Sequence, residues 1–160
     1  SYFLESLKKI VEMEEQLKEK QDDETLRAAK AMGFSDKFIA KLWGKGEMEV
    51  WRDRVDRGIM PVYRMVDTCH TGAYIPYFYS SYTGKNDSIL TNKPKAVVLG
   101  AGPIRIGQGV EFDYSTVHAV TTIKKSGYES IIINNNPETV STDYTTADKL
   151  YFEPLTPASR

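Results

Sequence analysis

The sequence predicts an α + α/β protein, in which a small helical domain precedes a lobe built from a strand, a helix and a further strand. Apolar residues recur at helical spacing through residues 2–57, against a background of acids and bases broken by glycines. After Pro94 the pattern changes to short apolar runs on either side of a single helical stretch. Such runs are typical of buried parallel strands joined by a crossover helix.

The N-terminal part of the chain is expected to form four helices. Apolar residues predict an amphipathic helix from residue 2 to about 20, with an apolar stripe that needs a partner surface. Asp22-Asp23-Glu24 favours the start of a second helix, and Ser35 is expected to cap a third over residues 36–43. A fourth helix is expected over residues 47–57. Three glycines are placed to end the last three helices: Gly33, Gly44 and Gly58.

Residues 61–94 are interrupted by prolines and glycines and are crowded with aromatic side chains. Aromatic residues can stack nucleic-acid bases, but here they are not interleaved with Lys or Arg. We therefore expect them to anchor an extended segment across neighbouring domains. The predicted domains are a helical domain over 1–70, an aromatic-rich linker over 71–94 and an α/β lobe over 95–160.

The lobe is predicted from three apolar runs and one helical pattern. KAVVLG (95–100), SIIIN (130–134) and KLYF (149–152) are expected strands, and residues 114–126 an expected helix with Asp113 as its N-cap. A right-handed crossover brings the carboxyl ends of the strands to one edge of the sheet. The segments GAGPIRIGQG and NNNPETVSTDY both leave strands at that edge, where α/β proteins bind ligands.

The first of these segments is a glycine-rich loop in the position of a phosphate-binding turn. Its glycines are Gly100, Gly102, Gly107 and Gly109. The dinucleotide fingerprint requires glycine where this chain has Arg105, and the Walker pattern requires Lys and then Ser or Thr after the last glycines. The second strand also ends in Asn134 rather than in an acid that would hold a ribose. Neither common nucleotide motif is therefore present.

Composition restricts the classes of function. The 21 basic and 22 acidic residues give no bias towards nucleic acid or membrane, and no apolar run approaches a membrane span. GFSDKFIAKLWG resembles a helix-turn-helix in length, but its region is charge-balanced, which disfavours DNA binding. Cys69 has no cysteine partner, which favours a reducing, cytoplasmic setting. His70 and His118 lack ligand partners at a suitable spacing, so no metal site is expected.

Two long motifs, GPIRIGQGVEFDY and NNNPETVSTDYTTADKLYFEPLT, resemble the large chain of carbamoyl-phosphate synthetase at the start of its second synthetase half. The resemblance extends back through GFSDKFIAKLWG and PVYRMVDTC to YFLESLKKIVEMEE, which is similar to the family's oligomerisation domain. It implies that the lobe is a Rossmann-like pre-ATP-grasp lobe. Residues 157–160 depart from the helix start expected there, so we expect a truncated middle part of a longer chain.

The resemblance implies an ATP-dependent ligase that makes carbamoyl phosphate from bicarbonate, glutamine-derived ammonia and two ATP, for arginine and pyrimidine biosynthesis. The implied partners are a glutaminase small subunit and other large chains, with self-association through the helical domain. ATP and Mg²⁺ (or Mn²⁺) belong to the family's ATP-grasp module. We therefore expect no cofactor and no catalytic residue in these 160 residues, which alone would be inactive.

The resemblance also places the glycine-rich loop at the floor of the active site and at the mouth of a route for carbamate. The residues expected there are Arg105, Gln108 and Glu111. Arg105 and Glu111 could instead pair with each other or cap the following helix. A second, polar loop either holds the shape of the first or touches substrate; its residues are Asn136, Glu138, Thr139, Ser141 and Asp143. The alternative for the whole chain is a free-standing nucleotide-binding α/β switch protein with a helical interaction domain.

Overall fold

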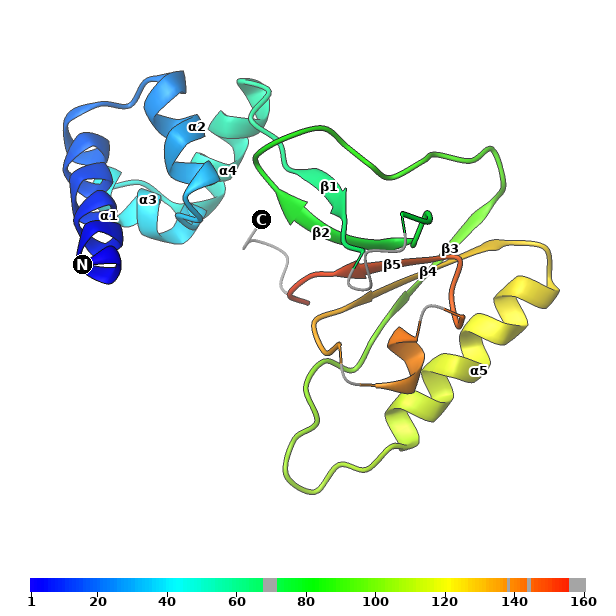
Figure 1. The fold of residues 1–160 in the computed structure, drawn as a ribbon. Coiled ribbons are helices and arrows are strands. Elements are labelled where there is room, and N and C mark those ends of the chain that lie inside the picture. Colours follow the sequence, from blue (N-terminus) through cyan, green and yellow to red (C-terminus); the bar gives the residue numbers. More distant parts are fainter. Residues whose placement is uncertain (68–71, 138, 144, 156–160) are drawn as a thin grey trace. The chain divides into compact units, whose positions relative to one another are not determined.

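The computed structural model describes residues 1–67, 72–137, 139–143 and 145–155. Two compact units divide the chain, one formed by residues 1–61 and the other by residues 62–155 (Figure 1). Cys69, His70 and Glu138 lie outside the described residues. Within the described ranges, no helix has the length and apolar character needed to cross a membrane.

The first unit consists of the four predicted helices. They are α1 (Tyr2–Glu19), α2 (Asp23–Ala31), α3 (Asp36–Trp43) and α4 (Glu47–Asp56). The side chain of Asp22 accepts a hydrogen bond from the Thr25 amide at 2.8 Å, and Ser35 caps α3 by accepting from Phe38 at 3.1 Å. Gly44 ends α3 in the left-handed region at φ 64°. The predicted helix starts and stops are therefore confirmed.

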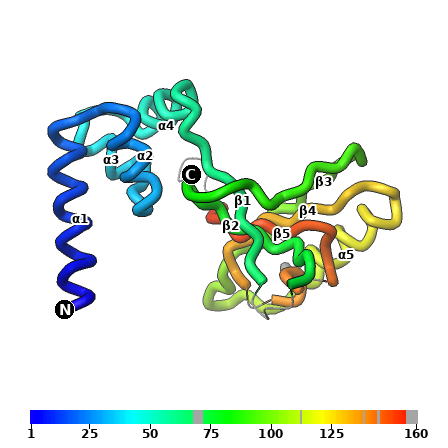
Figure 2. Tube along the Cα trace, turned by 45° about the horizontal axis from the view of Figure 1, so that its top comes forward, coloured from blue at the N-terminus to red at the C-terminus, as the bar shows by residue number. Residues whose placement is uncertain are grey.

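The core of the first unit is formed by one side chain or more from each helix. Leu17, Leu26, Ile39 and Val50 are fully buried, and the indole of Trp43 donates to the Leu17 carbonyl at 2.7 Å. Only the C-terminal half of α1 takes part in this core. The N-terminal turns of α1 project beyond the other three helices (Figure 2), and their apolar side chains are exposed: Phe3, Leu4, Leu7, Ile10 and Val11.

A buried charge cluster also joins three helices of this unit. Asp36 is fully buried, and its two carboxylate oxygens accept from Lys30 Nζ and Arg54 Nε, each at 2.8 Å. Lys30 also donates to the Phe34 carbonyl and Arg54 to the Ile59 carbonyl. Burial lowers the pKa of Lys30, and the hydrogen bond to Asp36 opposes this shift.

The second unit is a five-stranded sheet with a helix on one face (Figure 1). Its strands are β1 (Val62–Met65), β2 (Tyr77–Ser81), β3 (Lys95–Leu99), β4 (Glu129–Asn134) and β5 (Lys149–Phe152), in the order β1-β2-β5-β4-β3. Among the strands of the described ranges, β1 and β2 pair antiparallel and the other three pairs are parallel. Helix α5 (Glu111–Lys125) packs Val120 into a core with Ile132, Leu150 and Phe152. The predicted βαβ unit and its third strand are confirmed.

Strands β1 and β2 were not predicted. The aromatic segment expected as a linker contributes β2, which lies inside the sheet between β1 and β5. Its aromatic side chains pack across the strand pair, with Phe78 stacked on Tyr151 at 5.1 Å between ring centroids and Tyr79 on Phe152 at 4.8 Å. Because β2 pairs with a strand some 70 residues later, short-range patterns do not reveal it.

Candidate functional site

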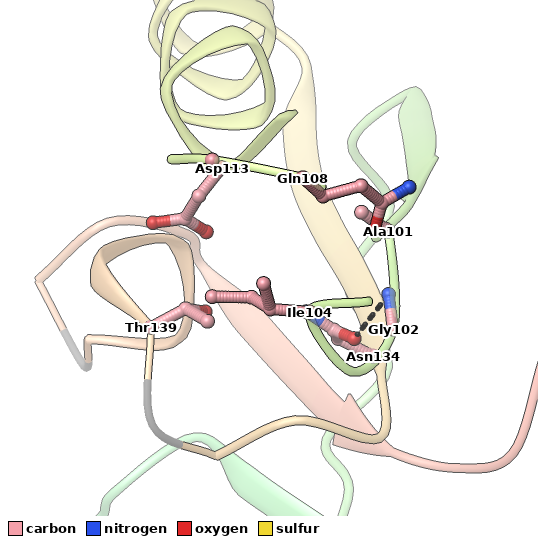
Figure 3. A pocket seen from close by; sticks show the side chains of 8 residues that line it. Ala101, Gly102, Ile104, Gln108, Asp113, Asn134 and Thr139 are labelled. Carbon is pink, nitrogen blue, oxygen red and sulfur yellow. Dashed lines mark hydrogen bonds between the residues drawn. The ribbon is translucent and has the colours of Figure 1, made fainter. Parts of the chain in front are cut away.

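The candidate site lies where β3 and β4 end. The glycine-rich loop follows β3 and leads into α5, while the polar loop follows β4 and contains a short 3₁₀ helix, η1 (Val140–Thr142). Between the loops is a pocket of about 20 Å³ (Figure 3), enough for one water molecule. It is lined by Ala101, Gly102, Ile104, Gln108, Gly109, Asp113, Asn134 and Thr139.

Gly100 allows the two loops to approach each other closely. The side chain of Asn134 packs against it, and a Cβ at position 100 would lie 2.6 Å from Asn134 Cγ. Asn134 is 2% exposed, and its Oδ1 accepts from the Gly102 amide at 3.2 Å (Figure 3). The same oxygen accepts from the Asn136 amide at 3.3 Å. One buried amide side chain therefore contacts both loops.

Gln108 stabilises the middle of the glycine-rich loop. Its side-chain Oε1 accepts from the Arg105 backbone amide at 3.1 Å, and its backbone amide donates to the Arg105 carbonyl at 3.0 Å. Gly107, inside this turn, has φ 87°, a conformation that non-glycine residues rarely adopt. Gln108 thus fixes the backbone of the loop while it lines the pocket.

The predicted N-cap role of Asp113 is wrong. Helix α5 begins at Glu111, three residues earlier than expected, with Val110 at the N-cap position and no side-chain cap. Asp113 therefore lies in the first turn, and both of its oxygens accept from the Ser141 amide, at 3.2 and 3.1 Å. Figure 3 shows its carboxylate extending from α5 towards the polar loop.

Arg105 and Glu111, the two charged residues expected at the carbamate route, are both exposed. Among the residues that the structure describes, no ion pair joins them. Glu111 is the first residue of α5, where a carboxylate interacts favourably with the helix dipole. Its Oε2 lies against Gly109, where a Cβ would come within 2.4 Å of it. The loop thus presents a cation and an anion without joining them.

The polar loop is held by hydrogen bonds within itself and to the sheet. Thr139 and Thr142 form a capping box around η1, and the Tyr77 hydroxyl donates to the Thr142 carbonyl. Ser141 is 1% exposed. Asp143 accepts from the amide and hydroxyl of Thr145, and these hydrogen bonds lower its pKa. Thr139 lines the pocket, whereas Ser141 and Asp143 are engaged in shaping the loop.

His118 lies on α5, with its ring 4.2 Å from that of Tyr114 between centroids. The described part of the chain holds no group of three His, Cys, Asp or Glu side chains arranged for a metal ion.

Sequence reasoning does not identify two residues of the site. It gives Asn134 only as the end of a strand and Asp113 only as a helix cap. A polar residue directly at the end of a buried strand, followed by two more asparagines, is a signal for such a loop contact. Nothing local in the sequence indicates that Asp113 reaches Ser141.

The fold and the site define an α/β lobe with a ligand edge at the carboxyl ends of its parallel strands, in a chain that also has a helical domain. Residues 92–159 match the family model of the carbamoyl phosphate synthase preATP-grasp domain. Residues 1–58 match that of the carbamoyl-phosphate synthetase large chain oligomerisation domain. The two matches together cover more than three quarters of the sequence. The chain belongs to the carbamoyl-phosphate synthetase large chain family.

Proposed function

We propose that these residues provide the floor of a synthetase active site and an assembly surface, in an ATP-dependent ligase that makes carbamoyl phosphate from bicarbonate, glutamine-derived ammonia and two ATP. The product would serve arginine and pyrimidine biosynthesis in the cytoplasm. The observation that carries this proposal is the pocket between the glycine-rich and polar loops, in a chain of this family.

The size of the pocket favours a role in shaping a site over a role in binding nucleotide. At about 20 Å³ it accommodates one water molecule, far less than ATP. In this proposal ATP and Mg²⁺ (or Mn²⁺) are bound by other domains of the large chain. In this proposal, backbone atoms of the two loops lie close to the path of a small reactive intermediate.

Glu111 and Arg105 are the residues proposed to handle carbamate, an anion. Their side chains are exposed on the glycine-rich loop and at the start of α5. A carboxylate repels an anion and a guanidinium attracts it. For two unit charges in close contact, the interaction energy is ~1 kcal/mol in water and ~4 kcal/mol near a protein surface. Gln108, whose side chain accepts from the Arg105 amide, fixes the backbone from which the guanidinium extends. Charge placement of this kind would direct carbamate along a route.

The helical domain is proposed to bind a second copy through α1. Phe3, Leu7 and Ile10 lie on the same side of the helix as buried Leu17, so the exposed residues continue a stripe that the core covers only in part. In an antiparallel pair centred on Leu7, Leu4 faces Ile10 of the second copy, and Phe3 faces Val11. The apolar stripe is thus self-complementary, as a two-fold interface requires. A glutaminase small subunit is the further expected partner.

Assays of the isolated 160-residue chain test the first part of the proposal. We expect no carbamoyl phosphate and no bicarbonate-dependent ATP hydrolysis, and weak binding of ATP in a calorimetric titration. The same titration with NAD and duplex DNA tests the alternatives of a nucleotide-binding switch and a DNA-binding module. Bicarbonate-dependent hydrolysis, or tight binding of any of these ligands, would contradict the proposal.

A further inference from the structure

Single polar side chains join the polar loop to the glycine-rich loop on one side of the pocket and to the start of α5 on the other. On the strand side, buried Asn134 accepts from Gly102 in the glycine-rich loop and from Asn136 in the polar loop. On the helix side, Asp113 accepts from Ser141 in the polar loop. Both side chains line the pocket, so these contacts span it.

The strand-side contact depends on the close fit of Asn134 against Gly100. Asn134 is 2% exposed and lies against Gly100, where a Cβ would be 2.6 Å from Asn134 Cγ and 2.7 Å from Nδ2. Such a distance is below any ordinary carbon contact, so alanine at position 100 would displace Asn134. Gly100 therefore permits the position from which Asn134 holds both loops.

The helix-side contact is charged. Each oxygen of Asp113 lies within 3.2 Å of the Ser141 amide, and Ser141 is 1% exposed. Hydrogen bonds to an ionised acceptor are stronger than those between neutral groups. Asp113 also belongs to the first turn of α5, two residues after Glu111. It therefore links the helix start that carries Glu111 to the polar loop.

We propose that Asn134 and Asp113 are positioning residues that fix the separation of the two loops, and with it the position of Gln108 at the pocket and of Glu111 at the start of α5. This inference rests on the proposed function for the part that concerns carbamate. Neither residue is proposed to react with or bind the intermediate. Their effect is to keep the route narrow, so that carbamate does not escape or meet solvent water.

Hydrogen exchange of the 160-residue chain tests the clamps directly. In Asn134→Ala we expect the Gly102 and Asn136 amides to exchange about fivefold faster, and in Asp113→Ala the Ser141 amide about tenfold faster. Asn134→Asp and Asp113→Asn keep an acceptor and should restore part of the protection. Gly100→Ala should reproduce the Asn134→Ala pattern with the asparagine still present.

Asp148→Ala is the matched control, because Asp148 accepts from the Ser130 amide at 2.8 Å between β4 and β5, away from the pocket. It should accelerate exchange at Ser130 and leave Ser141 unchanged. Unchanged loop amides in the clamp variants would overturn the proposal. Equal acceleration throughout β4 and α5 would also overturn it, since that indicates a general loss of stability.

The same variants in a full-length synthetase connect the clamps with the reaction. Asn134→Ala and Asp113→Ala should lower carbamoyl phosphate formed per ATP several-fold, with Asn134→Asp and Asp113→Asn less affected, while bicarbonate-dependent ATP turnover persists. If Glu111→Gln uncouples the reaction and the clamp variants do not, the clamp proposal is wrong. If none of them uncouples it, the proposed carbamate route is overturned, and with it the role of the clamps in that route.

Discussion

Asp36 is the residue on which the helical unit depends most strongly. Its carboxylate is fully buried between Lys30 and Arg54, which are themselves 4% and 1% exposed. The three residues come from α2, α3 and α4, so the cluster joins three short helices that have little core of their own. Removing one member of a buried ion pair leaves the other charge uncompensated, which is more costly than losing a surface pair.

Asp36→Ala is therefore expected to destabilise the helical unit by about 3–5 kcal/mol. Both tryptophans of the chain, Trp43 and Trp51, lie in this unit, so urea unfolding followed by tryptophan fluorescence measures the change. The control is Asp23→Ala, which removes an exposed contact with Arg57 and should shift the midpoint little. Similar effects of the two substitutions would mean that the buried cluster adds nothing beyond surface charge.

Glu129 is a buried carboxylate that stabilises the α/β lobe, as Asp36 stabilises the helical unit. Its carboxylate is 3.1 Å from Lys149 Nζ and accepts from the Thr91 hydroxyl at 2.8 Å. Burial opposes its ionisation, but the hydrogen bonds from Thr91 and Lys149 outweigh this and hold its pKa below the usual range. Because the folded state binds the proton less readily than the unfolded state, Glu129 stabilises the fold above its ordinary pKa of about 4.3. That contribution is lost as the pH falls from there through the lower pKa of the folded state.

Glu129→Gln should therefore lower stability at neutral pH by about 1–3 kcal/mol, and the difference from the parent chain should shrink below about pH 4. Urea titrations at several pH values, followed through NMR signals of buried Ile132, measure this. Glu5→Gln on exposed α1 is the control and should show no such trend. A difference that stays constant down to pH 3 would contradict the assigned pKa direction.

Helix α1 shows how an element is divided between two tasks. Its C-terminal half places Leu17 in the core, while Phe3 and Leu7 remain 76% and 59% exposed. An apolar stripe of this kind on a surface helix marks an interaction site. Leu4 and Ile10 are equally far from Leu7 in the sequence, so the stripe can pair with the same stripe of a second copy.

Leu7→Glu is expected to abolish self-association while preserving the helix, because it places a charge at the centre of the apolar stripe and Glu is a good helix former. Lys9→Glu is the control and should leave association unchanged, because residues two apart lie on opposite faces of a helix. Sedimentation velocity over a concentration series measures the association. A parent chain that stays monomeric at high concentration, or a loss as large in Lys9→Glu as in Leu7→Glu, would rule out this interface.

Across the whole molecule, local sequence signals predicted those helices and strands whose conformation depends on neighbouring residues. Ser35, Gly44 and the apolar runs of β3 and β4 determine their own conformations, and the four N-terminal helices and the βαβ unit were predicted from them. Strands β1 and β2 were missed because β2 is stabilised by pairing with distant β5. At the site, the glycine-rich and polar loops were predicted to meet, and the run of asparagines after β4 is a local signal for the Asn134 clamp. The Asp113 clamp depends on a tertiary contact with Ser141 that no local pattern encodes.

The start of α5 was predicted at the wrong residue for the same reason, because it involves a tertiary contact. Asp113 looked like an N-cap because it precedes a helical pattern, yet the helix begins at Glu111 and Asp113 binds Ser141 instead. A contact between residues 28 positions apart outweighed the local capping preference. The result places Glu111 on a helix terminus, with a more defined position than a loop residue would have.

The most direct test of the central proposal is the coupling of ATP use to product in a full-length synthetase with Glu111→Gln. This substitution keeps the shape of the side chain and removes its charge. We expect glutamine hydrolysis and bicarbonate-dependent ATP turnover to persist while carbamoyl phosphate formed per ATP falls. If product and ATP turnover instead remain coupled as in the parent enzyme, or if the substitution lowers the unfolding midpoint of the α/β lobe as much as a core truncation, Glu111 has a structural role and the carbamate route is wrongly assigned.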